Sequence, residues 1–315
     1  MKHVLIDTDP GIDDALALLL AFSSPELKVE GVTTVVGNVS LELANLNALK
    51  MLEFLGATDV PVSPGASKPL ACEAVDGVGI HGRAGLGGAV LPEPRMRLDG
   101  RSAVQLIMEK AEELGDRLTI IPIGPLTNIA EAIRAEPGIA DEIGGLVIMG
   151  GAYSLTPYGH GNVNAVAEYN VWHDPEAAKI VFDSGVPVKA VGLDVTTNPM
   201  NRLSPEMFGE IESLDTARAR LVADICRDLV RRTHGLSLHD PLAVAVAVDP
   251  SLVETKRFKV DVETAGHLTR GMTVVDRRRY HVTSESKGNV DVCISVDDER
   301  FLRLFIDRVV RGLEA

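Results

Sequence analysis

Residues 7–15 of this chain read Asp7-Thr8-Asp9-Pro10-Gly11-Ile12-Asp13-Asp14-Ala15. A short apolar run at 4–6 precedes this stretch, and a longer apolar run at 16–22 follows it. The order predicts a buried strand, a tight turn broken by proline and glycine, and then a helix. We therefore expect the first strand of the chain to end in a group of acidic side chains.

These acidic side chains need an explanation, because carboxylates that share a dry pocket repel one another unless a cation neutralises them. A hard divalent metal ion with oxygen ligands suits such a group. Helix capping is a simpler explanation for Asp13 and Asp14, which would complement the positive end of a helix. Capping leaves Asp7 and Asp9 without a role, so we interpret the segment as part of a metal site.

Short strands rich in β-branched residues alternate with helices along most of the chain. Strands are predicted at 29–36, 60–62, 118–123, 146–149 and 188–195, and helices at 41–55, 174–184 and 242–248. This alternation indicates an α/β fold with a mostly parallel central sheet flanked by helices, an open Rossmann-like core. We expect one domain, 1–315, with a small added strand pair within 258–275. Ligands bind beyond the carboxyl ends of the strands in such sheets.

The composition excludes several classes of protein. The formal net charge is −14, so neither nucleic acid nor an anionic membrane is an expected partner. The three cysteines lie far apart in the sequence and match no disulfide or metal spacing. The N-terminus lacks the pattern of a signal peptide, and no apolar run is long enough to cross a bilayer. We expect a cytoplasmic protein.

Four further features could belong to a site. Residues 73–91 form a long glycine-rich stretch around His81, which is typical of a lid. Asn162 lies in a polar loop, Glu168 and Asn170 precede a helix, and His239-Asp240 opens another. Taken singly, each has an ordinary interpretation as a turn residue, a surface residue or a helix cap.

Taken with residues 7–15, however, these features resemble the nucleoside hydrolases, the calcium-dependent inosine-uridine-preferring family. The matching stretches occur in the family's order, at 32–38, 80–82, 122–130, 149–151, 167–170, 174–178 and 239–241. The resemblance implies an enzyme that hydrolyses the N-glycosidic bond of ribonucleosides to free base and ribose. It also implies a homodimer or homotetramer.

The resemblance implies one Ca²⁺ as cofactor. The ion would be held by the carboxylates of Asp9, Asp14 and Asp240 and by the backbone carbonyl of Ile123, an all-oxygen set that suits calcium. Asp9 would also be the general base for the attacking water. Asp7 would orient these ligands from behind.

The resemblance also implies how the substrate is held. Asp13 would bind the ribose 2′-hydroxyl, with Asn38 and Asn170 nearby, while Asn162 and Glu168 would hold the 5′-hydroxyl end. His239 and His81 are candidates for protonating the leaving base, because imidazole can donate a proton near neutral pH. They complete the predicted catalytic set.

The preferred base is less well indicated. Purine-specific members stack the base on tryptophans, whereas the only tryptophan here, Trp172, is interpreted as a core residue. Residues 218–238, which would border the base, do not match the family closely. We expect a pyrimidine-preferring or broad enzyme.

Two other functions compete with this interpretation. A magnesium phosphohydrolase of the haloacid dehalogenase type also begins with Asp-x-Asp after a strand, but Pro10-Gly11 does not fit its continuation. A nucleoside- or ribose-binding protein without turnover would be expected to lack the base, yet Asp9 is present. Release of ribose from uridine would identify the hydrolase, and release of phosphate would identify the phosphatase.

Overall fold

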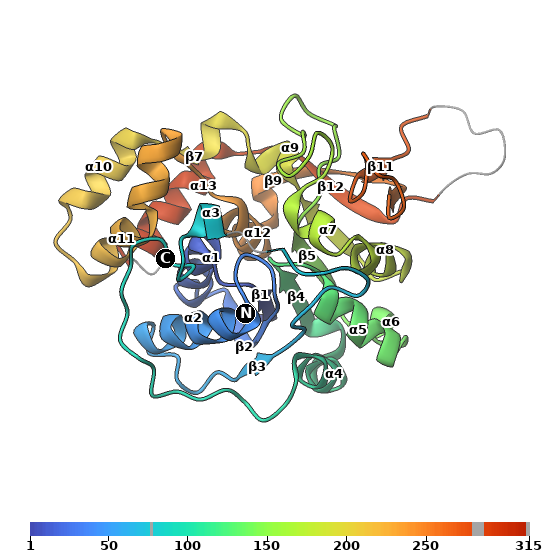
Figure 1. The fold of residues 1–315 in the computed structure, drawn as a ribbon, viewed down its shortest axis with the longest axis horizontal. Helices are drawn as coiled ribbons and strands as arrows, with labels where there is room; N and C mark the ends of the chain where they lie inside the picture. Colours follow the sequence, from blue (N-terminus) through green and yellow to red (C-terminus); the bar gives the residue numbers. More distant parts are fainter. Residues whose placement is uncertain (76–77, 279–286, 313–315) are drawn as a thin grey trace.

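The computed structural model of this chain describes residues 1–75, 78–278 and 287–312 (Figure 1). Its centre is an eight-stranded sheet in the order β3-β2-β1-β4-β5-β6-β12-β9. These strands are β1 (Lys2–Thr8), β2 (Leu27–Thr34), β3 (Val62–Pro64), β4 (Leu118–Pro122), β5 (Gly145–Met149), β6 (Val188–Val191), β9 (Val253–Phe258) and β12 (Val290–Val296). Neighbouring strands are parallel except for β12 with β9, which confirms the predicted mostly parallel sheet.

Helices cover both faces of this sheet (Figure 1). Helices α1 (Ile12–Phe22), α2 (Leu41–Phe54), α11 (Ala217–Thr233), α12 (His239–Val248) and α13 (Asp298–Phe305) pack into one apolar core. Helices α4 (Ala103–Leu114), α5 (Thr127–Ala135), α6 (Ile139–Glu142) and α8 (Pro175–Asp183) pack into the other. The remaining helices are α3 (Val78–His81), α7 (Tyr169–His173), α9 (Leu193–Thr196) and α10 (Pro205–Ser213).

Two helices of the first layer are apolar on nearly every side. Residues 240–248 of α12 are all buried, as are most residues of α1, and these two helices pack against each other. A helix that is apolar all round belongs inside a protein rather than at its surface. The pairing brings the start of α12 next to the start of α1, although more than 220 residues separate them in sequence.

Two small antiparallel pairs lie outside the main sheet. Strands β10 (Val260–Val262) and β11 (Thr273–Val275) form the strand pair that was predicted within 258–275. The second pair, β7 (Arg202–Leu203) with β8 (Leu236–Ser237), was not predicted, because two-residue strands leave no periodic pattern. Residues 76 and 77 of the predicted lid lie outside the described residues.

One predicted strand was too long. The strand expected at 188–195 ends at Val191, and α9 begins at Leu193. The β-branched residues of this segment favour a strand, but a tertiary contact overrides the preference. The carboxylate of Asp194 in α9 accepts hydrogen bonds from the backbone N–H groups of Tyr153 (2.7 Å) and Leu155 (2.6 Å), which fixes the turn.

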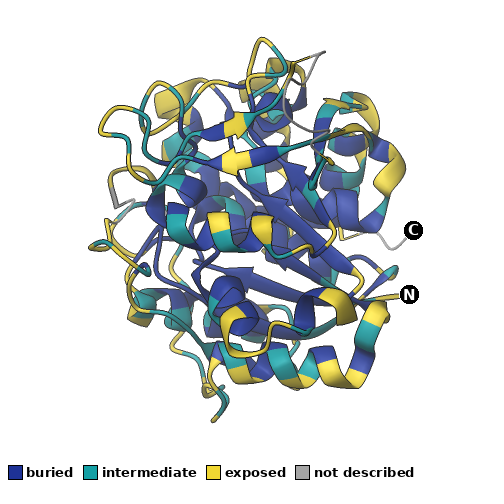
Figure 2. Ribbon diagram, turned by 90° about the vertical axis from the view of Figure 1, so that its right-hand side faces the viewer, coloured by how far each residue is buried: buried dark blue, intermediate teal, exposed yellow. Residues whose placement is uncertain are grey.

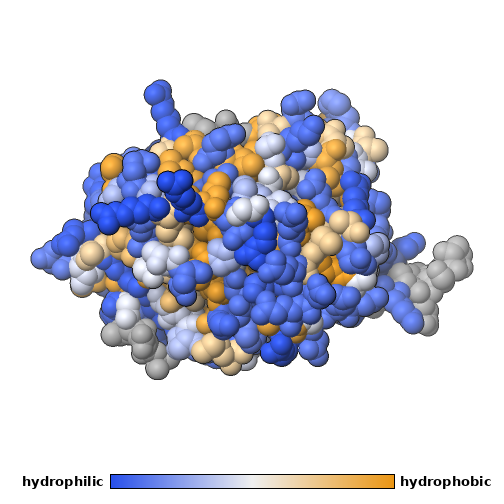
Figure 3. All heavy atoms as spheres, turned by 90° about the horizontal axis from the view of Figure 1, so that it is seen from below, coloured by the Kyte–Doolittle hydropathy of each residue, from blue (hydrophilic) through white to orange (hydrophobic). Residues whose placement is uncertain are grey.

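The central strands β1, β4 and β5 are buried over most of their length, whereas the edge strand β9 is largely exposed (Figure 2). Hydrophilic side chains predominate on the face shown in Figure 3, with apolar side chains in smaller groups between them. Among the described residues, no helix combines the length and apolar character needed to span a membrane. Because β1, β2, β4 and β5 run parallel, their carboxyl ends meet at one edge of the sheet, where the predicted site residues follow them.

Candidate active site

Asp14 anchors the turn that links β1 to α1. Its Oδ1 accepts hydrogen bonds from the Thr8 hydroxyl (2.6 Å) and the Asp9 N–H (3.2 Å). Its Oδ2 accepts from the Gly11 N–H and from the Asn38 side-chain amide, both at 2.9 Å. The bond to Gly11 caps the first turn of α1. One carboxylate thus ties together the end of β1, the start of α1 and the loop after β2.

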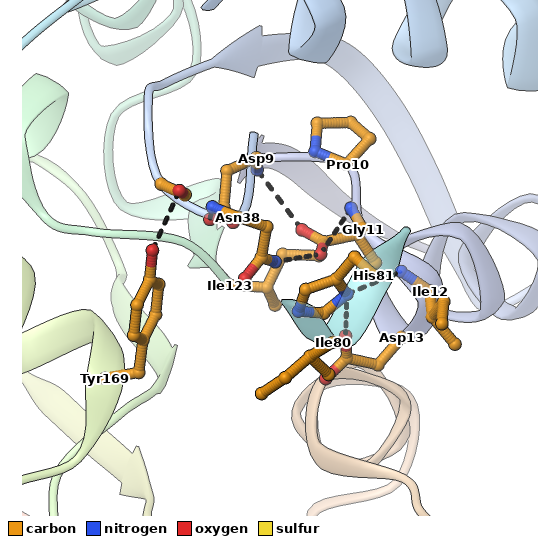
Figure 4. Close-up of polar contacts among 12 residues, drawn as sticks. Asp9, Pro10, Gly11, Ile12, Asp13, Asn38, Ile80, His81, Ile123 and Tyr169 are labelled. Atoms are coloured by element: carbon orange, nitrogen blue, oxygen red, sulfur yellow. Dashed lines mark hydrogen bonds and ion pairs between the residues drawn. The ribbon is translucent and has the colours of Figure 1, made fainter. Parts of the chain in front are cut away.

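Asp9 is fully buried between two glycines, near Asn38 and Ile123 in Figure 4. Its Oδ2 accepts a hydrogen bond of 2.6 Å from the Asn38 N–H, while its buried Oδ1 has no partner among the described residues. A Cβ atom would lie 2.0 Å from Oδ2 if built on Gly37, and 2.6 Å from Oδ1 if built on Gly124. The carboxylate therefore fits only because both positions lack a side chain.

Three carboxylates could jointly hold a metal ion. Asp13, Asp14 and Asp240 each offer an oxygen, and these oxygens lie within 4.8 Å of one another. Burial and then repulsion from neighbouring carboxylates raise the pKa of Asp13 to about 6 and the pKa of Asp240 and Asp9 well above the usual range. A bound cation would reverse this repulsion, so the arrangement suits a metal site.

The predicted ligands are placed only partly as expected. Asp14 and Asp240 belong to the group of three, whereas its third member is Asp13 and not Asp9. The Ile123 carbonyl oxygen accepts a hydrogen bond of 3.0 Å from the Asn170 side-chain amide, which leaves it one further lone pair. The exact set of metal ligands therefore stays a prediction.

Asp7 lies behind the group of three carboxylates and does not line the cavity over the strand ends. Its Oδ1 accepts hydrogen bonds from the Thr33 hydroxyl (2.5 Å) and the Asn128 side-chain amide (2.7 Å). Burial raises the pKa of Asp7 to about 7. Because Asn128 also donates to the Thr34 carbonyl (2.9 Å), this network joins the ends of β1 and β2 to α5. The position is compatible with the supporting role predicted for Asp7, which stays a prediction.

A cavity of about 360 Å³ opens over the carboxyl ends of the strands. Nine of the residues predicted for the site line it, namely Asp13, Asn38, His81, Ile123, Asn162, Glu168, Asn170, His239 and Asp240. Asp7, Asp9 and Asp14 lie below its surface. The structure thus brings together residues from across the chain that the sequence placed in one site.

Glu168 and Asn170 shape one wall of this cavity. The buried Glu168 carboxylate accepts hydrogen bonds from the N–H groups of Gly151 (2.9 Å), Asn170 (2.8 Å) and Val171 (3.1 Å) and so caps α7. Burial raises the pKa of Glu168, and these three bonds oppose the increase. The Asn170 amide also donates to the Met149 carbonyl at 3.1 Å. The wall is therefore held rigidly by backbone contacts from two strand ends.

The two histidines reach the cavity from different elements. His81 lies in α3, and its Nδ1 accepts a hydrogen bond of 3.1 Å from the Ile12 N–H (Figure 4), so the neutral ring carries its proton on Nε2. His239 opens α12, and its Nδ1 lies 2.8 Å from the Thr196 hydroxyl. Burial lowers the pKa of both histidines. For His239, Asp13 opposes this lowering.

The rest of the cavity lining consists of residues that were not predicted for the site. They are Ile80, Met149, Val163, Tyr169, Arg202, Leu229, Arg232, Thr233, Gly235, Leu236 and Ser237, several of them within 218–238. Arg232 in α11 donates to the backbone carbonyls of Gly79 (3.1 Å) and Ile80 (3.0 Å), which fastens α3 to α11. Trp172 is half-buried and does not line the cavity.

The chain is similar to known proteins over nearly its whole length. The family model for inosine-uridine preferring nucleoside hydrolase matches residues 4–303. The chain is 39% identical over 314 residues to a pyrimidine-specific ribonucleoside hydrolase, RihA, of Shigella boydii, covering 97% of each protein. A RihA of Escherichia coli matches with the same identity and coverage.

Two solved structures share the fold over nearly the whole chain. A purine-preferring ribonucleoside hydrolase from Gardnerella vaginalis has a TM-score of 0.89 at 37% identity, covering 99% of both chains. A plant nucleoside hydrolase, PpNRh1, has a TM-score of 0.90 at 33% identity, covering 98% of this chain and 99% of its own. The matches extend over the sheet and over every element that contributes to the cavity. This chain therefore belongs to the inosine-uridine preferring nucleoside hydrolase family and is a nucleoside N-ribohydrolase.

Proposed function

We propose that this enzyme hydrolyses pyrimidine ribonucleosides in preference to purine ribonucleosides, with one bound Ca²⁺ and with Asp9 as general base. The relatives named RihA are pyrimidine-specific, whereas the similar Gardnerella vaginalis enzyme is named purine-preferring, so names alone do not decide. The cavity supports the pyrimidine choice. Its walls include the aliphatic side chains of Ile80, Leu229 and Leu236, and the tryptophan on which a purine would stack lies elsewhere.

The observation that carries this proposal is the group of buried carboxylates at the floor of the cavity. Asp9 Oδ1 and Asp13 Oδ1 are buried without hydrogen-bond partners among the described residues, which is costly unless a cation binds there. Carboxylate and carbonyl oxygens are the ligands that Ca²⁺ prefers. We infer that Asp9, Asp14, Asp240 and the Ile123 carbonyl would hold it. When bound, calcium would offset the repulsion and lower the pKa of a water molecule.

The roles of the side chains follow from their positions. Asp9 would accept the proton of the attacking water, because its buried Oδ1 has no hydrogen-bond partner among the described residues. Asp13, with Asn38 and Asn170 nearby, would bind the 2′-hydroxyl and favour the positive charge that develops on the sugar. Asn162 and Glu168 would hold the 5′-hydroxyl end. Each of these groups except Asp9 lines the cavity.

The histidines would act on the leaving base. The Nε2–H of His81 is free to donate, because Nδ1 is bound by the Ile12 N–H. We expect His81→Ala and His239→Ala to lose at least tenfold in kcat/KM with uridine but little with 4-nitrophenyl riboside, whose leaving group needs no proton. Equal losses with both substrates would mean that the histidines shape the site and do not assist the base.

The proposed substrate class is tested by a panel of uridine, cytidine, inosine and adenosine, with release of ribose as the readout. We expect the pyrimidine nucleosides to have the higher kcat/KM. The phosphatase alternative is tested in parallel by phosphate release from uridine 5′-monophosphate. Ribose release only from inosine and adenosine would contradict the pyrimidine assignment, and phosphate release would contradict the reaction itself.

The calcium site is tested separately by calorimetry on protein freed of metal with a chelator. We expect Ca²⁺ to bind with one-to-one stoichiometry and to restore turnover, and Asp240→Asn to weaken both effects. A conservative change at an exposed acid away from the site, Asp215→Asn, serves as control. Full activity in protein shown to be metal-free would refute the calcium assignment.

A further inference from the structure

The cavity has two chemically different ends. One end holds the carboxylates and amides that suit a sugar, among them Asp13, Glu168 and Asp240. The other end is formed by β7, α11 and β8, where the aliphatic side chains of Leu229 and Leu236 lie among polar and cationic ones and no carboxylate of the described residues lines the cavity. A nucleoside that places its ribose at the first end must place its base at the second. One permanently charged side chain at that second end, Arg202, has no role in binding the sugar, the metal or the lid.

Arg202 is held in place by backbone carbonyls. It lies in β7, opposite Ser237 of β8, and its Nη2 donates to the carbonyl oxygens of Gly235 (3.1 Å) and Thr233 (3.4 Å). These carbonyls lie at the C-terminal end of α11, where the helix dipole is negative and favours a cation. The guanidinium is therefore fixed at the cavity wall.

The hydrogen-bonding capacity of Arg202 is only partly used. Its Nε is buried and has no acceptor among the described residues. Within the described ranges, no carboxylate forms an ion pair with it and Nη1 makes no hydrogen bond. A buried donor without an acceptor is costly, so a purely structural arginine would be expected to bond more fully. A buried Nε is out of reach of a ligand, so Nη1 of this cavity-lining side chain is the group that offers a cation and unused donors to whatever occupies this end of the cavity.

We propose that Arg202 contacts the leaving base and favours pyrimidines, because its guanidinium donates to the carbonyl oxygen next to the glycosidic nitrogen. This inference rests on the proposed function. A pyrimidine nucleoside has a carbonyl at C2, directly beside N1, whereas the atoms beside N9 of a purine carry no oxygen. A donor placed to reach that oxygen discriminates between the two classes of base.

The contact also helps the reaction. The bond between ribose C1′ and pyrimidine N1 breaks, and both electrons pass to the base, where N1 and the C2 oxygen share the negative charge. The water oxygen bonds to C1′, and a proton of the water passes to Asp9, which later releases it to solvent. The departing pyrimidine takes up one proton. Arg202 stays protonated throughout, because guanidinium does not titrate in this range. A fixed cation at the oxygen stabilises the charge as it develops.

The test compares Arg202→Met and Arg202→Lys with the wild type on three substrates. For uridine we expect Arg202→Met to lose 10- to 100-fold in kcat/KM, the range for a hydrogen bond to a charged group. Inosine and 4-nitrophenyl riboside, which lack the carbonyl, should change by less than about threefold. Arg202→Lys keeps the charge but not the planar donors, and it should fall between the wild type and Arg202→Met on uridine only.

Arg227→Met is the matched control, because Arg227 lies on the exposed side of α11 and pairs with Glu212 and Asp224. It should leave all three substrates unchanged. Equal losses on all three substrates in both Arg202 variants would overturn the proposal, because they would show that Arg202 only supports α11. If Arg202→Met does not fold, the substrate pattern of Arg202→Lys decides alone. Failure of the wild type to release ribose from uridine would instead refute the proposed function.

Discussion

Gly37→Ala would test the catalytic role of Asp9 without changing any chemical group of the site. The added Cβ would lie 2.0 Å from Asp9 Oδ2 and 2.9 Å from Pro125 Cδ. Ordinary contact requires about 3.4 Å, so the carboxylate must move by more than 1 Å. That movement would break its 2.6 Å hydrogen bond with the Asn38 N–H. A displacement of about 1 Å at a reacting group costs about 100-fold in rate, and overpacking costs about 1–3 kcal/mol in free energy of unfolding.

The assay measures kcat/KM for ribose release from uridine, together with calcium content and the urea midpoint. Gly100→Ala is the control, because a Cβ at that position meets nothing within 4 Å. We expect Gly37→Ala to fall about 100-fold in kcat/KM while remaining folded, and Gly100→Ala to match the wild type. If Gly37→Ala kept more than half of the wild-type activity, the position of the Asp9 carboxylate would not matter to the reaction, and its assignment as base would be wrong.

Three further predictions concern other parts of the molecule. Arg232→Met should raise KM for uridine about tenfold, because it frees α3 from α11. Arg231→Met, one residue away and outside the cavity, should leave KM unchanged. If Arg232→Met had the same KM as the wild type, the lid role would be contradicted. Burial lowers the pKa of His173 to about 4, so the unfolded chain binds a proton that the folded chain does not between about pH 6.5 and 4. The free energy of unfolding should therefore fall by about 3 kcal/mol more for the wild type than for His173→Leu across that window, as measured by urea unfolding; parallel curves would refute the shifted pKa. Finally, 2′-deoxyuridine should have a kcat/KM at least 100-fold below that of uridine, because Asp13 would lose its partner; comparable values would remove Asp13 from the sugar site.

The half of the site that we propose for the sugar was predictable, because its residues stand at strand ends and helix starts. Asp9 follows an apolar strand directly, and Asp13 and Asp240 lie in the first turns of apolar helices, so the general rule for parallel sheets places them together. Glu168 could be read equally well as a surface residue, and only the structure shows it buried as the cap of α7.

The half that we propose for the base was not predictable from local patterns. Arg202 lies in a two-residue strand, and its contact with Gly235 depends on how the end of α11 turns, which no periodicity reports. The identity of the metal ligands was not predictable from local patterns either. The sequence indicates that carboxylates gather, but whether Asp9 or Asp13 completes the group depends on distances below 5 Å.

The pairing of α1 with α12 has a consequence for how the protein is made. During synthesis Asp13 and Asp14 emerge first, whereas Asp240 follows only after about three quarters of the chain. Strands β1 to β6 can already pair at that point, because they occupy one side of the sheet without a gap. A nascent chain therefore carries the acidic turn for most of its translation without the third carboxylate, so the proposed metal ion would not have all of its carboxylate ligands while the early sheet forms. Ion capture would instead report that the chain has been completed through α12.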